Sequence, residues 1–123
     1  MRTRNHALAA VIAIGAAAML LHAQPPKTGE ALFASRCAGC HSLDRDKEGP
    51  RLAGVYGRAA ASVEGFSYSS ALSKAKLTWN GETLDKWLAD PDRLVPGNDI
   101  GFHVDNPDDR RAIIQFLKQN SGK

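Results

Sequence analysis

The sequence at residues 37–41 is Cys37-Ala38-Gly39-Cys40-His41, which has the pattern C-x-x-C-H. Two thiols at this spacing can each add to one of the two vinyl groups on a haem edge, and the next residue can present an imidazole to the iron. The pattern therefore predicts one covalently attached haem c, bound through Cys37 and Cys40, with His41 as the proximal ligand of the iron. The tether would hold the haem even in a chain too small to enclose it.

Other uses of a cysteine pair fit this sequence less well. A structural zinc site normally needs four protein ligands, and no second pair of ligands follows at a suitable spacing. A redox-active C-x-x-C normally belongs to a βαβ pattern, which is absent here. A plain disulfide would leave His41 unexplained. Haem attachment is the interpretation that uses all three residues.

The length and charge of the chain exclude several classes of protein. The chain has 123 residues and a mass of 13.2 kDa, with 43% hydrophobic and 24% charged residues. These values indicate one compact domain rather than a disordered or fibrous chain. The formal charge is +3, but only +1 remains in residues 24–123 once Arg2 and Arg4 are set aside. A nearly neutral domain argues against a nucleic-acid binder and against a polybasic membrane-surface protein.

The N-terminal segment has the order of regions of a secretory signal. Arg2 and Arg4 precede an apolar run at residues 7–21, and Ala23 stands just before a polar stretch. Fifteen residues rise about 22 Å as a helix, which is short of a hydrocarbon core of roughly 30 Å. We expect a signal peptide at 1–23 and a mature domain at 24–123 in the periplasm. An uncleaved N-terminal anchor is the alternative.

Capping residues and periodic apolar residues predict four helices in the mature chain. They begin near Thr28, Ser67, Asn80 and Asn106, and Pro91 ends the third. Glycine and proline predict long loops at 42–65 and 92–105. No strand pattern of convincing length is present. The predicted fold class is all-α with long loops.

With these residues placed, the mature chain resembles a class I cytochrome c over nearly its whole length. Gly29 and Phe33 match the family's N-terminal helix, and the apolar face formed by Ile113, Phe116 and Leu117 matches its C-terminal helix. The resemblance implies a small fold in which these two helices cross and long loops wrap one covalently bound haem.

The resemblance also assigns residues around the haem. The stretch around Pro50 resembles the family's loop in which a proline carbonyl accepts the ring N–H of the proximal histidine, which would make Pro50 the residue that orients His41. Arg58, Tyr68 and Trp79 match the segments that hold the haem propionates. Trp87 stands where the family usually has an aromatic residue packed on the haem.

One position departs from the family's pattern. The family's next signature is a Pro-Gly loop that brings a methionine sulfur to the sixth position of the iron. Here Ile100 occupies the place of that methionine, and an isoleucine side chain cannot bind iron. The sequence contains only Met1 and Met19, both within the predicted leader.

Three hypotheses for the sixth position follow. His103 could bind the iron, although it lies three residues beyond Ile100, or about 10 Å of extended chain, so the loop would have to leave the family's path. The position could instead be open or filled by water. Asn98, Lys74 or Lys76 could also bind.

The functional expectation is a carrier of single electrons between periplasmic redox proteins, without enzymatic chemistry of its own. Losing methionine should lower the reduction potential, because a methionine ligand raises it. Where the family often has a lysine near the haem edge this chain has Asp99, so electrostatic steering to a strongly acidic partner is not expected. The alternatives are a haem protein that binds NO or CO, a haem subunit of a larger oxidoreductase, and a weak peroxidase-like activity.

Overall fold

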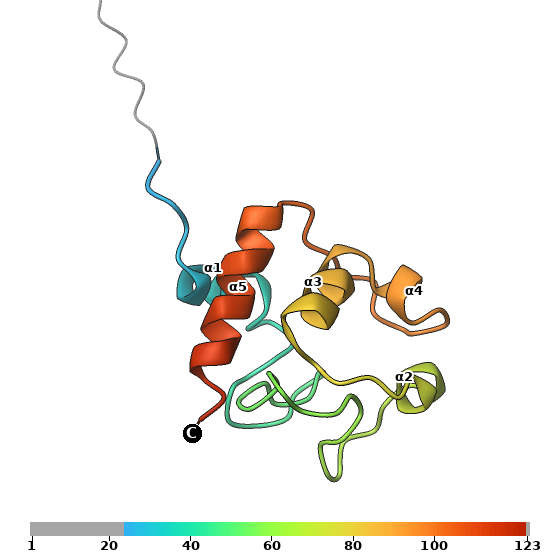
Figure 1. The fold of residues 1–123 in the computed structure, drawn as a ribbon. Coiled ribbons are helices and arrows are strands. Elements are labelled where there is room, and N and C mark those ends of the chain that lie inside the picture. The colour runs from blue at the N-terminus through green and yellow to red at the C-terminus, as the bar shows by residue number, and fades with distance from the viewer. Residues whose placement is uncertain (1–23, 123) are drawn as a thin grey trace, which may run out of the picture.

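The computed structural model describes residues 24–122, which form five helices and no strand (Figure 1). The helices are α1 (Gly29–Arg36), α2 (Ser70–Lys74), α3 (Gly81–Ala89), α4 (Pro91–Leu94) and α5 (Pro107–Gln119). A single isolated β-bridge joins Ala59 to Thr78 within the long loops. The predicted all-α class is confirmed. The predicted signal peptide at 1–23 lies outside the described residues.

The crossing of α1 and α5 organises the fold, as Figure 1 shows on its left side. Gly29 sits at the contact, where an added Cβ would lie only 2.1 Å from the carbonyl oxygen of Ala112. Only glycine therefore allows the two backbones to approach this closely. Beside the crossing, the rings of Phe33 and Phe116 pack with their centroids 5.2 Å apart. The predicted crossing of the N- and C-terminal helices is confirmed.

The core fills the space between these two helices, α3 and the loops. Its buried members are Leu32, Phe33, Val55, Trp79, Leu84, Val104, Ile113 and Leu117. Ile113 and Val104 are the most deeply buried large side chains of the described part of the chain. They come from α5 and from the loop that precedes it, so the core also anchors that loop.

Helix boundaries agree with the predicted starts near Thr28, Asn80 and Asn106, and differ around Pro91 and near Ser67. The Asn80 side chain accepts hydrogen bonds from the backbone N–H groups of Glu82 and Thr83, and the predicted cap is confirmed. Pro91 ends α3 as expected, but it also begins α4, so the prediction of a loop from residue 92 onward is wrong for 92–94. Proline suits the first position of a helix because its missing N–H would have no partner there, and the Asp90 side chain caps the new helix.

The helix near Ser67 is also shorter than the expected 67–75. It begins after Ser69, whose hydroxyl accepts a hydrogen bond from the N–H of Leu72 at 3.1 Å, and it ends at Lys74. No helix among residues 24–122 is long and apolar enough to cross a membrane.

Candidate haem site

One large cavity collects almost every residue that the sequence singled out. Its volume is about 500 Å³, and apolar side chains such as Leu52, Leu72, Leu88 and Leu117 form much of its wall. The predicted site residues on this wall are Cys37, Cys40, His41, Pro50, Arg58, Tyr68, Trp79, Trp87 and Ile100. His103, which the sequence suggested as a possible sixth ligand, does not line it.

The turn that follows α1 places the two thiols and the imidazole on one wall. Cys37 is the C-cap of α1, and its carbonyl accepts a hydrogen bond from the N–H of His41 at 2.9 Å. Cys37 is half-buried and Cys40 exposed, and both thiols are free. Burial raises the pKa of the Cys37 thiol, and a hydrogen bond to Glu48 raises that of Cys40. The two free thiols border one cavity, where each could add across a vinyl group of a haem.

The His41 ring is held from two sides. Its Nδ1 lies 2.8 Å from the carbonyl oxygen of Pro50, so an N–H there donates to the carbonyl and leaves Nε2 free for a metal. Burial lowers the pKa of His41, which keeps the imidazole neutral, as metal ligation requires.

Gly49 forms the second side of this clamp and was not singled out from the sequence. A Cβ on Gly49 would lie 2.3 Å from Cε1 of His41, so the ring packs directly against the backbone. The N–H of Gly49 also donates to the carbonyl of Cys40 at 2.8 Å, which closes the loop over the ring. The only signal in the sequence was a glycine immediately before Pro50.

Arg58, Tyr68 and Trp79 come from different loops and meet at the same cavity. The Arg58 guanidinium donates to the carbonyl oxygens of Arg51 (3.0 Å) and Ala53 (3.3 Å), and burial lowers its pKa. The Tyr68 hydroxyl accepts a hydrogen bond from the backbone N–H of Val63 at 3.1 Å, which leaves its own hydrogen available.

Trp79 provides an indole N–H donor in this group. The residue is 7% exposed, and no fully buried side-chain nitrogen or oxygen among residues 24–122 lacks a hydrogen-bond partner. Its ring packs edge-on against Trp87, with centroids 5.3 Å apart, and both rings line the cavity. An indole N–H on a residue that lines the cavity can donate to an acidic group of a bound ligand.

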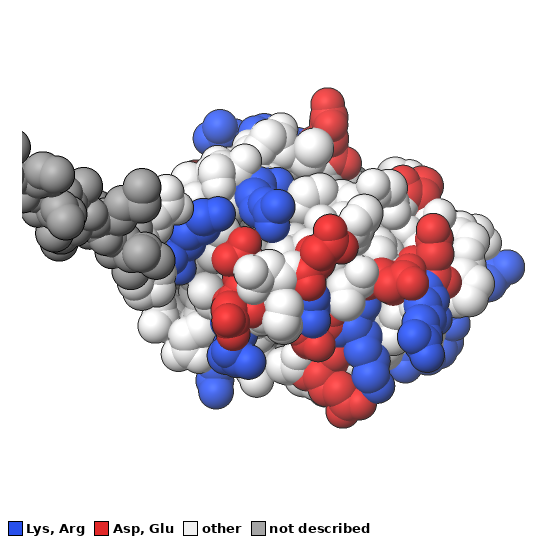
Figure 2. Space-filling view, turned by 90° about the horizontal axis from the view of Figure 1, so that it is seen from above, with Lys and Arg blue, Asp and Glu red and all other residues white. Residues whose placement is uncertain are grey.

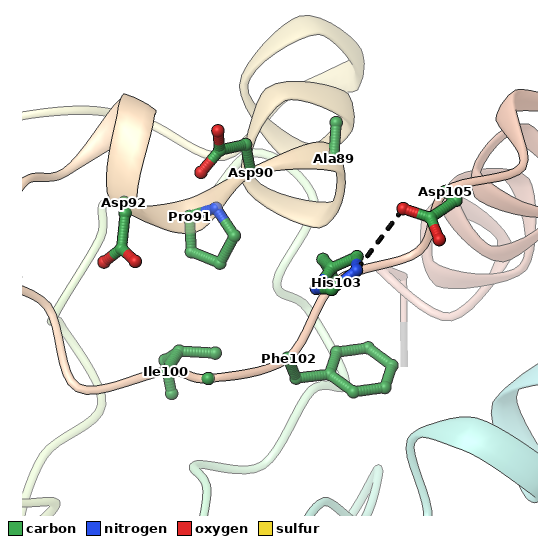
Figure 3. A pocket seen from close by; sticks show the side chains of 9 residues that line it. Ala89, Asp90, Pro91, Asp92, Ile100, Phe102, His103 and Asp105 are labelled. Atoms are coloured by element: carbon green, nitrogen blue, oxygen red, sulfur yellow. Dashed lines mark ion pairs between the residues drawn. The ribbon is translucent and has the colours of Figure 1, made fainter.

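The segment after α4 provides a different wall. Ile100, Gly101 and Phe102 line the cavity, and the carboxylate of Asp99 stands beside them. Ile100, Gly101 and Phe102 also line a smaller cavity that they share with His103, shown in Figure 3, so this stretch borders two cavities. Ile100 and Phe102 are partly exposed, at 39% and 41%.

His103 is held away from the large cavity. It lines a second cavity of about 380 Å³, and its Nε2 lies 3.3 Å from Oδ1 of Asp105, the contact dashed in Figure 3. Its side chain is 58% exposed. Lys74, Lys76 and Asn98 do not line the large cavity either.

These observations fit a covalently bound haem. The cavity has free thiols and a clamped neutral imidazole on one wall, apolar side chains around it, and the indole of Trp79 on a further wall. A haem has the matching parts: two vinyl groups and an iron, an apolar ring, and two carboxylates. Residues 24–122 contain no group of three or more His, Cys, Asp or Glu side chains that could hold a bare metal ion.

Comparisons with known proteins agree with the site. The cytochrome c family model matches residues 26–121. Cytochrome c2 iso-2 of Magnetospirillum molischianum is 48% identical over 85 residues, covering 67% of this chain and 88% of that protein. Cytochrome c of Gibberella zeae is 38% identical over 99 residues, covering 77% and 93%.

A solved structure has the same fold. Cytochrome cH from Methylobacterium extorquens superposes with a TM-score of 0.70 at 40% identity, covering 74% of this chain and 94% of that one. Its fold, the family match and the geometry of the cavity support one conclusion. The chain belongs to the cytochrome c family and is a class I monohaem cytochrome c, an electron carrier that binds one covalent haem c.

Proposed function

We propose that this cytochrome carries single electrons between redox proteins in the periplasm. The observation that carries the proposal is the clamped imidazole of His41, held between Gly49 and the carbonyl of Pro50 in the wall of an apolar cavity. The bound haem supplies the redox chemistry, since its iron accepts and releases one electron.

The wall that carries His41 attaches and orients the cofactor. Cys37 and Cys40 would form the two thioether links, and His41 would bind the iron through Nε2. Pro50 fixes the rotation of the imidazole, because its carbonyl accepts the hydrogen bond from Nδ1. Gly49 blocks tilting of the ring toward the loop. A ligand that cannot rotate or tilt keeps the reorganisation on electron transfer small.

The remaining residues neutralise and shield the haem. Arg58, Tyr68 and Trp79 are the proposed partners of the propionates, to which they offer N–H and O–H donors. Trp87 and Ile100, which line the cavity, would pack against the macrocycle and limit its contact with water. A dry, apolar surrounding strengthens these polar contacts and tunes the potential of the iron.

Periplasmic location rests on the N-terminal sequence. The basic start, the apolar run at 7–21 and Ala23 support export and cleavage of residues 1–23. The intact mass of the protein purified from its native membrane and periplasmic fractions tests this. Haem-loaded protein that begins near residue 24 is expected in the periplasmic fraction, and a chain that retains residues 1–23 in the membrane would indicate an anchor.

The distribution of surface charge affects how the protein associates with its partners. In Figure 2, acidic and basic side chains are interspersed, and neither sign covers the visible face as one continuous patch. Residues 24–123 carry a net charge of only +1. Association with partners should therefore depend only weakly on ionic strength.

Stopped-flow mixing tests the carrier role. The reduced protein is mixed with oxidised redox proteins from the same compartment, and the oxidised protein with reduced ones. Electron transfer fast enough for turnover with at least one donor and one acceptor is expected. If the protein copurifies in a fixed ratio with a larger oxidoreductase and reacts only inside that complex, it is a haem subunit instead.

A further inference from the structure

Apart from the attachment motif, the described residues that line the haem cavity include no strong second ligand for the iron. Nitrogen and thioether ligands of haem iron come from histidine, lysine and methionine. Among the described residues that line this cavity, His41 is the only histidine, and there is no lysine and no methionine. The thiols of Cys37 and Cys40 are used in attachment.

Candidate ligands near the cavity are engaged elsewhere. The Asn98 amide donates to Asp92 and to the carbonyl of Val95 at 3.0 and 2.8 Å, and its oxygen accepts from the N–H of Ile100 at 2.7 Å. This network fixes the loop just before Ile100. His103 does not line this cavity, and its Nε2 lies 3.3 Å from Oδ1 of Asp105.

The stretch 100–102 presents the cavity with an apolar surface. Ile100 and Phe102 line it, and Leu72 and Leu88 come from neighbouring helices. None of these four side chains has a hydrogen-bond donor. Asp99, the polar neighbour on this wall, carries a negative charge. Such a surface disfavours anionic ligands, which would lose their hydration, and tolerates small neutral ones.

We propose that the sixth coordination position of the haem iron, on the side covered by Ile100, is a binding site for a neutral diatomic ligand of the CO or NO type. The carbon of CO donates its lone pair to ferrous iron. No electron is transferred, no protein bond breaks, and any water at the position leaves unchanged. CO and NO need no hydrogen-bond donor from the protein, whereas bound O2 is stabilised by one. The proposed site requires covalent attachment of the haem, but it does not require the proposed role in electron transport.

CO titration of the reduced protein, followed by its visible spectrum, tests the proposal. A saturable shift of the main haem band with one CO per haem is expected. A sharp low-spin spectrum that does not change under saturating CO would overturn the proposal, because it would mean that a strong protein ligand already occupies the position.

Ile100→Met supplies a thioether at the position in question. The variant should become low-spin, and its affinity for CO should fall about 100-fold if methionine occupies the iron in 99 of 100 molecules. Ile100→Ala serves as a second variant that adds no ligand, and it should still bind CO. Equal CO affinity in Ile100→Met and the native protein, with both low-spin, would contradict the role assigned to Ile100.

His103→Ala is the matched control on the same stretch. It should leave the reduced spectrum and the CO affinity unchanged, because His103 does not line the cavity. A gain of CO binding in this variant alone would identify His103 as the sixth ligand and overturn the proposal. Electron-transfer rates measured in parallel keep the two proposals separate, since a protein that ignores CO can still carry electrons.

Discussion

Two walls of one cavity are built in contrasting ways. The wall at residues 37–50 holds His41 by a 2.8 Å hydrogen bond to Pro50 and by direct packing on Gly49. The wall at 99–102 presents Ile100 and Phe102, while the nearby His103 turns to the exposed carboxylate of Asp105. One wall orients a metal ligand, and the other provides an apolar surface without one.

The contrast indicates that one wall attaches the haem, whereas the other controls its reactivity. Residues 37–50 are contiguous, so local hydrogen bonds can set the whole arrangement of thiols and imidazole. The wall at 99–102 can change its chemistry through a single side chain, because the loop is fixed by Asn98 whatever stands at position 100. Substitutions around the cavity test whether attachment and reactivity are controlled by different walls.

The largest effect is expected from removing both attachment points. Cys37→Ala combined with Cys40→Ala should abolish covalent haem binding, since each thiol forms one of the two links. The intact mass of the denatured protein measures this directly. Haem that remains attached after acidic organic extraction would show that another residue forms a link.

Gly49→Ala tests the clamp on His41. The added Cβ would lie 2.3 Å from the ring, and overpacking of this kind costs about 3 kcal/mol of unfolding free energy. Urea unfolding of the haem-loaded protein measures the loss. Gly39→Ala is the matched control, because a Cβ there meets nothing within 4 Å and should change the free energy by less than about 0.5 kcal/mol. Equal losses in the two variants would mean that the close contact does not hold the ring.

Trp79→Phe tests whether the indole N–H of Trp79 binds an acidic group of the haem. Loss of a hydrogen bond to a charged group costs about 1.5 kcal/mol or more, and the smaller ring adds to that cost. Trp87→Phe is the comparison, because its ring lines the same cavity but is proposed only to pack. Unfolding in urea should show the larger loss for Trp79→Phe, and the reverse order would exclude the proposed propionate contact.

The smallest effect is expected at the pair formed by His103 and Asp105. Both side chains are more than half exposed, at 58% and 90%, and exposed ion pairs contribute about 0–1 kcal/mol. Asp105→Ala should lower the unfolding free energy by less than about 0.5 kcal/mol and leave the visible spectrum unchanged. A new low-spin spectrum in this variant would show that Asp105 restrains His103 from reaching the iron.

Much of the site can be predicted from residues that lie close together in the sequence. The spacing of Cys37, Cys40 and His41 predicts the cofactor because the chemistry requires adjacent groups, and the caps at Thr28, Asn80 and Asn106 predict helix starts because caps act within one turn. The helix at 91–94 escaped prediction because Pro91 both ends one helix and begins another.

The sequence by itself determined that a haem is attached and that residues 24–123 contain no methionine to bind its iron. Only the tertiary structure showed that Ile100 lines the large cavity and that His103 does not. Three residues of separation place His103 near Ile100 along the chain, but Ile100 borders both cavities whereas His103 borders only the smaller one. The contact of Gly49 with His41 likewise became visible only in three dimensions, because packing depends on how the loop folds back and not on spacing.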